Sequence, residues 1–188
     1  MPRIPAKKTS EAGFFLKLAY RFAGRRYGAV PEPMAVVAHH PGLLRANSVH
    51  ELLVERASKK LPSSVRELAV YRVATQVGCS WCVDFGTMLQ LHDGLDIERL
   101  KSIDSYETSP AFTVQERLAL AYADAMTVGS MSVTDEQVGS LEREFGRDGV
   151  IELTYQIALE NMRARMNSAL GIVDQGFTSG DACRIPLP

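Results

Sequence analysis

The stretch that decides the fold is RELAVYRVATQVGCSWC, residues 66 to 82. A stripe of apolar side chains at helical spacing runs along its first part: Val70, Val73, Ala74 and Val77. Gly78 follows the stripe, and glycine commonly ends a helix. Cys79 and Cys82 come next, at the expected start of another helix, so we expect two helices that meet at Gly78.

Glu67 is the charged residue of this stretch whose role depends on how the two helices are arranged. Ser64 and Glu67 have the spacing of a capping box, which would account for Glu67 as a structural residue. In one continuous helix Glu67 would lie about 22 Å from Cys82 and could not act on it. If the chain reverses at Gly78 into an antiparallel hairpin, Glu67 comes level with residues 86–90, on the face of the cysteines. A buried carboxylate there could take a thiol proton.

Helix signals dominate the rest of the chain, and no convincing alternating strand appears. The expected helical segments are 34–62 in pieces broken near Pro41, 79–94, 113–127 opening with a Thr113/Glu116 capping box, 133–146 ended by Gly146, and 149–172. The last segment is apolar on several sides in its first half, so we expect it to be central and buried. The fold class is therefore all-α.

Composition bounds the classes of function. With 188 residues, 46% of them apolar and 23% charged, the chain is most simply one globular domain. A net charge of −1 provides no global field to recruit nucleic acid, so no nucleic-acid partner is expected. No apolar run approaches the length of about 20 residues that spans a bilayer, so no membrane partner is expected.

The N-terminal part has a different character, and we divide the chain into a basic amphipathic arm (1–30), a main domain (31–175) and a tail (176–188). Lys17 interrupts the apolar patch GFFLKLAY, which excludes a secretion signal. The arm is expected to dock on the body or on a partner chain. Three cysteines in 188 residues are too few for a disulfide scaffold, so a reducing, cytoplasmic setting fits best.

The cysteine pair has three interpretations. At a helix start, unpaired N–H groups and the helix dipole stabilise a thiolate, which attacks peroxides or disulfides while the neighbouring thiol resolves the product. A zinc site needs four ligands, and the remaining candidates lack finger-like spacing: Cys183, His39, His40, His50 and His92. Two inert core cysteines are the third alternative. Redox chemistry is favoured, with no metal and no cofactor.

The same stretch, RELAVYRVATQVGCSWC, resembles the signature of the carboxymuconolactone decarboxylase family, in its alkylhydroperoxidase D-like (AhpD-like) branch. The flanks VVAHHPGLLRA and QERLALAYADAMT are also similar, so the resemblance covers roughly residues 30–172. It implies an all-α AhpD-like fold with an antiparallel helical hairpin that carries the CxxC, in a homo-oligomer (trimer, hexamer or dimer). It also implies that Cys82 is the peroxidatic cysteine, Cys79 the resolving one and Glu67 the start of a proton relay.

The resemblance further implies a small hydroperoxide or other small substrate and a thiol protein that reduces the disulfide. The sequence departs from the family pattern where relay histidines are expected, since Trp81 and Gly86 occupy those positions. Trp81 could wall the pocket, and Gly86 leaves a hole for water, substrate or another histidine. Further candidates for a relay or pocket are Asp84, His39 and His40; Asp84 also fits a first-turn carboxylate favoured by the helix dipole.

Three functions remain open at this point. The favoured one is a thiol-dependent peroxidase of peroxiredoxin type, with an antioxidant role, or a disulfide oxidoreductase. The second is a small-molecule enzyme of the decarboxylase type, with the cysteines incidental, and the third is a non-catalytic binding module on the same fold. Polar residues on the last helix could line a site or an interface, with structural hydrogen bonding favoured: Asn161, Arg163, Arg165 and Asn167.

Overall fold

The structure, a computed structural model, describes residues 2–92, 94, 96–129 and 132–178. Its helices are η1 (Thr9–Glu11), α1 (Phe14–Tyr27), α2 (Glu32–Val37), α3 (Pro41–Ala57), α4 (Ser63–Val77), α5 (Ser80–His92), η2 (Ile97–Ser105), α6 (Val114–Val128) and α7 (Asp135–Leu170). No strand occurs in this part of the chain, and the all-α expectation is confirmed. None of these helices is long and apolar enough to cross a membrane.

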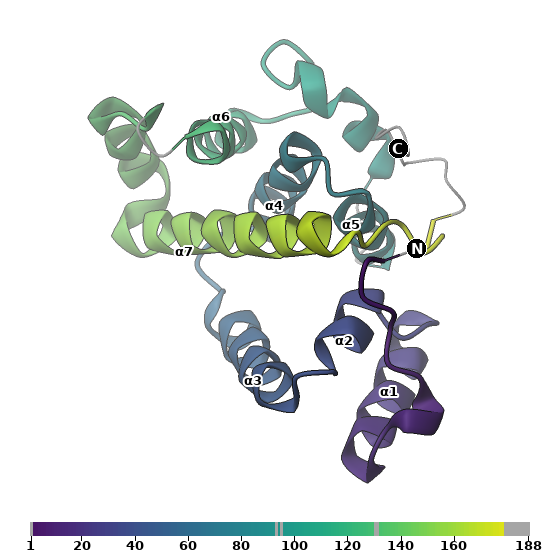
Figure 1. Cartoon of the computed structure of the whole chain (residues 1–188). Coiled ribbons are helices and arrows are strands. Elements are labelled where there is room, and N and C mark those ends of the chain that lie inside the picture. The colour runs from purple at the N-terminus through teal and green to yellow at the C-terminus, as the bar shows by residue number, and fades with distance from the viewer. Residues whose placement is uncertain (1, 93, 95, 130–131, 179–188) are drawn as a thin grey trace.

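The long helix α7 is the centre of the molecule. In Figure 1 it crosses the middle of the view, with α4 and α6 above it, α5 at its right-hand end, and α1, α2 and α3 below it. Leu153, Ile157 and Ala164 of α7 are fully buried against α4 and α6, as the apolar pattern predicted. The main core therefore lies among α4, α6 and α7, with α5 added at one end.

The predicted helical hairpin forms at Gly78. This residue adopts a left-handed conformation with φ of +76°, which costs a side-chain-bearing residue about 1–2 kcal/mol. The N–H groups of Gly78 and Cys79 donate to the carbonyls of Thr75 and Ala74 at 3.2 and 3.0 Å, the two bonds of a Schellman motif. Helix α4 therefore ends at a sharp reversal, and α5 begins two residues later beside it.

Two expectations about helix ends had different outcomes. The capping box at Thr113 and Glu116 is confirmed, with reciprocal bonds of 3.2 and 2.8 Å. The box at Ser64 and Glu67 is wrong. Helix α4 begins at Ser63 with Pro62 as its N-cap, two residues earlier than predicted, so Ser64 lies inside the helix and no side chain caps the helix.

The residues expected to form two helices, 133–146 and 149–172, form the single element α7, which has a break at Gly146. The φ of this residue is +68° and its ψ is 172°, so the helical path is interrupted where the sequence predicted a helix end. The part after the break carries all the α7 residues of the candidate site described below. The break thus separates a peripheral first part of α7 from the central second part.

The N-terminal arm and α3 expose much apolar surface. The exposed apolar side chains of α1 and α3 are Phe14, Phe15, Leu18, Phe22, Leu43, Val49, Leu52 and Leu53. Helix α3 has no fully buried residue, and α1 buries only Tyr20 and Ala23. Surface of this kind marks an interaction site more often than free solvent-exposed surface. At its start the arm is tied to the end of α7, where the Arg3 N–H donates to the Leu170 carbonyl at 2.7 Å.

Candidate active site

The cysteine pair lies at the start of α5 and is joined as a disulfide, with the two Cα atoms 5.3 Å apart. Cys79 immediately precedes the helix, and the Cys82 backbone N–H donates to Cys79 Sγ at 3.2 Å. Both residues are buried, Cys79 at 2% exposure and Cys82 at 7%. The sulfurs thus lie within reach of the first-turn N–H groups, where the helix dipole favours negative charge.

Asn167 of α7 contacts both sulfurs. Its Nδ2 donates to Cys82 Sγ at 3.4 Å and to Cys79 Sγ at 3.8 Å, and Asn167 is itself buried. A donor aimed at sulfur stabilises a thiolate more than a neutral thiol. The sequence indicated Asn167 only as one of four polar residues on the last helix. No local pattern joins it to a cysteine 85 positions earlier.

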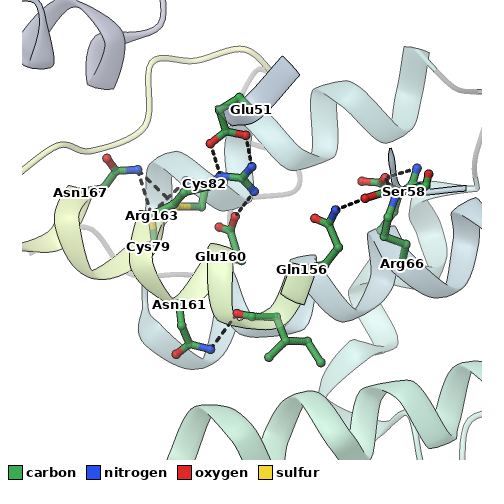
Figure 2. Close-up of polar contacts among 12 residues, drawn as sticks. Glu51, Ser58, Arg66, Cys79, Cys82, Gln156, Glu160, Asn161, Arg163 and Asn167 are labelled. Atoms are coloured by element: carbon green, nitrogen blue, oxygen red, sulfur yellow. Dashed lines mark hydrogen bonds and ion pairs between the residues drawn. A yellow bond between two sulfur atoms is a disulfide. The ribbon is translucent and has the colours of Figure 1, made fainter. Parts of the chain in front are cut away.

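Asn167 ends a row of polar side chains along one face of α7. Gln156, Glu160 and Arg163 precede it at helical spacing, and Figure 2 shows these side chains with the two cysteines at one end. At the far end, Gln156 Nε2 donates to Ser58 Oγ at 2.7 Å. The row therefore leads from the loop before α4 to the disulfide.

Arg163 is the centre of an ion-pair network in this row. Its Nε donates to Glu51 of α3 at 2.9 Å, its Nη2 pairs with the same carboxylate, and its Nη1 donates to Glu160 at 3.3 Å. Burial raises the pKa of Glu160 to about 7, with the charges of Glu51 and Glu67 adding to the effect and Arg163 opposing it. Glu160 is thus an internal carboxyl group that titrates near neutral pH.

Glu67, the predicted start of the relay, lies on α4 beside this network. Its Oε1 accepts from Nε and Nη2 of Arg66, each at 3.0 Å, and its side chain is 23% exposed. The negative charge of Glu67 contributes to the raised pKa of Glu160, so the two carboxyl groups interact. The relay role of Glu67 stays a prediction. Glu160 was not predicted from the sequence as a site residue.

Trp81, one of the two residues in place of histidines, belongs to an aromatic group on the outer side of α5. Its ring stacks on Phe85 with centroids 4.6 Å apart, and its Nε1 donates to Gln175 Oε1 at 2.7 Å. Phe85 in turn contacts Tyr27 and Phe177 edge to face. This group therefore joins α1, α5 and the segment after α7 next to Cys82.

Gly86, at the other histidine position, faces Tyr71 of α4. A Cβ added to Gly86 would lie 3.7 Å from Tyr71 Cδ2, which is ordinary van der Waals contact. Tyr71 is 2% exposed and belongs to the same core cluster as both cysteines. The Tyr71 ring therefore lies beside Gly86, at contact distance from a side chain placed there.

Asp84 points away from the sulfurs and holds the segment that follows α7. It is 2% exposed, and its carboxylate accepts from the backbone N–H groups of Gln175, Phe177 and Thr178 at 3.1, 3.0 and 2.9 Å, and from the Thr178 hydroxyl at 2.8 Å. These four bonds occupy both oxygens. Asp84 is thus a structural anchor in this structure.

His39 and His40 are both exposed and contact backbone groups. His39 Nε2 lies 2.9 Å from the Pro5 carbonyl oxygen, and His40 Nδ1 accepts from the Leu43 N–H at 3.1 Å at the start of α3. No cluster of His, Cys, Asp and Glu that could hold a metal occurs among the residues described. Cys183, the remaining thiol of the zinc alternative, lies outside the described residues.

Comparison with known proteins identifies the family. No protein-family model matches the chain. The uncharacterized protein YnjA of Escherichia coli K12 is 34% identical over 162 residues, which cover 86% of each chain. The debrominase Bmp8 superposes with a TM-score of 0.81 at 20% identity over 97% of each chain, and a cysteine-to-alanine variant of Bmp8 has been solved in complex with 2,3,4-tribromopyrrole.

A third similar structure is an AhpD-core protein from Ralstonia eutropha JMP134, described as peroxidase-related. It has a TM-score of 0.81 and 18% identity over 94% of each chain. The chain therefore belongs to the family of YnjA and has the AhpD-like fold of the carboxymuconolactone decarboxylase family. The predicted fold, with its antiparallel hairpin carrying the CxxC, is confirmed.

Proposed function

We propose that this protein is a thiol–disulfide enzyme that reduces a small hydroperoxide through Cys82 and Cys79. The observation that carries the proposal is the buried disulfide at the start of α5, with a backbone N–H and the Asn167 amide directed at its sulfurs. Both donors favour the thiolate that such chemistry requires. A pair of inert core cysteines would not need a polar donor from a helix so distant in the chain.

The proposed cycle balances with a dithiol as reductant. The Cys82 thiolate attacks one peroxide oxygen, the O–O bond breaks, and the alcohol leaves after taking a proton, so that Cys82 becomes a sulfenic acid. The Cys79 thiol then attacks the Cys82 sulfur, water leaves, and the disulfide forms. A partner dithiol reduces this disulfide and is itself oxidised. Glu67 is proposed to exchange protons with this pair, as the family resemblance implies.

The structure contains arguments for each cysteine as the nucleophile. Cys82 is the more exposed of the two, and the Asn167 amide lies 0.4 Å closer to its sulfur, at 3.4 Å against 3.8 Å. The Cys82 N–H, however, donates to Cys79 Sγ and would stabilise a thiolate there. We assign the attack to Cys82, because the peroxide must reach the attacking sulfur and Cys79 is the less exposed of the two residues.

A second substrate class, halogenated aromatic rings, is favoured by the aromatic group beside Cys82. Trp81 and Phe85 form a stacked pair on the same helix, and Bmp8, which shares the fold, is a debrominase. The net reaction would convert an aryl bromide and the dithiol of Cys79 and Cys82 into the debrominated ring, hydrogen bromide and the disulfide. The same partner dithiol would then regenerate the enzyme.

The exposed apolar side chains support a homo-oligomer, as the resemblance implied. Helix α3 has no fully buried residue, and four large apolar side chains of α1 are more than half exposed. A second copy that covers these faces would remove a large apolar area from water. Light scattering of the full chain tests this proposal, and replacing Phe15 with Glu is expected to lower the measured mass toward that of one chain.

The function itself is tested by hydroperoxide and tribromopyrrole consumption under a dithiol reductant. Single substitutions Cys82→Ser and Cys79→Ser are compared with Asn161→Ala, which keeps both thiols and lies on α7 with partners other than the cysteines. We expect Cys82→Ser to abolish turnover and Cys79→Ser to stop after one oxidation event, with a sulfenic acid trapped at Cys82. Full turnover of either substrate by the Cys82→Ser variant would exclude the proposed chemistry, and turnover of one substrate alone decides the substrate class.

A further inference from the structure

A cluster of charged side chains lies beside the row of α7 that ends at the disulfide. Its members are the carboxyl groups of Glu51, Glu67 and Glu160 and the guanidinium groups of Arg66 and Arg163. Three carboxylates against two guanidinium groups leave one uncompensated negative charge when all are ionised. A buried uncompensated charge is costly, and a carboxyl group then tends to keep its proton.

Glu160 is the member whose ionised form is least stabilised. Its side chain is 6% exposed, against 33% for Glu51 and 23% for Glu67. Arg163 directs Nε and Nη2 to Glu51 and only Nη1 to Glu160, while Arg66 directs two nitrogens to Glu67. Glu160 thus has the least hydration and the weakest share of positive charge.

The charges around Glu160 come from three helices. Arg163 faces it from α7, Glu51 from α3 and Glu67 from α4. Glu67 is itself paired with Arg66. Together with burial, the two carboxylates raise the pKa of Glu160 to about 7. Its protonation therefore changes in the pH range in which a cysteine thiolate is formed for catalysis.

The cluster is close enough to the disulfide for the two to influence each other. Glu160 and Asn167 are seven residues apart on one helix, a rise of about 10 Å, and the Asn167 amide contacts Cys82 Sγ. Two negative charges about 10 Å apart at an effective dielectric constant of about 20 shift each other's pKa by roughly one unit. Titration of one group therefore changes the titration of the other.

We propose that Glu160 and the reduced cysteine pair share one proton, so that a thiolate at Cys82 forms together with a neutral Glu160. The proposal rests on the redox role proposed above. Reduction by a dithiol delivers two electrons to the S–S bond and releases two protons from the reductant. One proton stays on Cys79 and the other goes to Glu160, which leaves Cys82 as the thiolate. Glu160 is a positioning residue, since its effect on Cys82 is through charge.

The test is the infrared difference spectrum between the oxidised and the dithiol-reduced full-length protein at pH 7.5. Wild-type protein is expected to gain a protonated-carboxyl band on reduction, and Glu160→Gln to lack this band. Glu152→Gln should retain it, since Glu152 is a buried carboxylate on the same helix that instead accepts from the Lys60 and Leu61 N–H groups. Glu160→Asp should restore a band at a shifted frequency, which controls for misfolding of the Gln variant.

The pH profile of Cys82 alkylation provides a second readout. Glu160→Gln removes a charge that disfavours the thiolate, so alkylation is expected to be faster than in the wild type above about pH 7, where Glu160 is ionised, and equal to it well below pH 7. A band that persists in Glu160→Gln, or one that disappears in Glu152→Gln, overturns the shared proton. Hydroperoxide turnover on the same samples separates the two proposals, because turnover without the band refutes only the shared proton, and the band without turnover refutes only the peroxidase.

Discussion

The side-chain amide of Asn167 lies 3.4 Å from the sulfur of Cys82 and donates to it across the interface of α7 and α5. The central helix of the fold therefore contacts the cysteine pair directly, besides forming the core. A hydrogen bond to a charged acceptor contributes about 1.5–3 kcal/mol, so this contact is large enough to matter for a thiolate.

Removing the amide is the first prediction. Asn167→Ala is expected to raise the pKa of the Cys82 thiol by about one to two units, because the thiolate loses its donor. Alkylation of the reduced protein at pH 7 should slow about tenfold or more. Asn161→Ala is the matched control, since Asn161 lies on the same helix and bonds Thr127 and the Ile157 carbonyl instead. Equal rates in the two variants would contradict the role of Asn167.

The second prediction concerns the missing histidine at position 86. Gly86→Ala should be tolerated, since its Cβ would meet the Tyr71 ring at an ordinary contact distance of 3.7 Å. Gly86→His should lower the free energy of unfolding by about 1–3 kcal/mol, because the imidazole would compete for space with the buried Tyr71 ring. The double variant Tyr71→Ala/Gly86→His should lose less free energy of unfolding than the sum of the losses in the two single variants. Urea unfolding of the four proteins measures this coupling, and strict additivity would show that the two side chains do not compete.

The third prediction concerns the anchor at Asp84. Asp84→Ala should lower the free energy of unfolding by about 3 kcal/mol or more, because it leaves buried N–H groups of the segment after α7 without an acceptor. Hydrogen exchange at residues 175–178 should accelerate. The control is Asp148→Ala, whose carboxylate is 71% exposed and pairs with an exposed Lys60, so a loss below about 1 kcal/mol is expected. Unchanged exchange in Asp84→Ala would contradict the anchor.

The fourth prediction is a dependence of stability on pH. The pKa of Glu160 is raised in the folded state from 4.5 to about 7, so between these values the folded protein holds a proton that the unfolded chain has released. The contribution of Glu160 therefore lowers stability as pH rises through this window, by up to about 3 kcal/mol. Glu160→Gln should flatten this part of the profile, whereas Glu152→Gln should not. Urea unfolding from pH 4 to 8 provides the comparison, and parallel curves for wild type and Glu160→Gln would contradict the raised pKa.

Much of the fold could be predicted because its signals are local. The apolar stripe before Gly78, the box at Thr113 and the apolar sides of the last helix each follow from a few neighbouring residues. The error at Ser64 is local as well, since the N-cap of α4 is Pro62, two residues before the predicted cap, which places Ser64 inside the helix. The hairpin was predictable because one glycine is sufficient to reverse the chain.

The site was harder to predict because its contacts join distant parts of the chain. Glu51, Glu160 and Asn167 each look like ordinary polar residues on their own helices. Their meeting depends on how α3 and α7 pack against the hairpin, which no spacing rule encodes. For the same reason the ring beside Gly86 belongs to Tyr71 of α4, one turn after Glu67, and not to one of the histidines.

The anchor at Asp84 also bears on how the protein is made. The thiols of Cys79 and Cys82 leave the ribosome long before Asn167 and before the donors at residues 175–178 that bind Asp84. Because synthesis proceeds from the N-terminus, the nascent hairpin has no cover over its cysteines until α7 has been translated. The pair is therefore open to premature oxidation during biosynthesis until the last helix packs against α5.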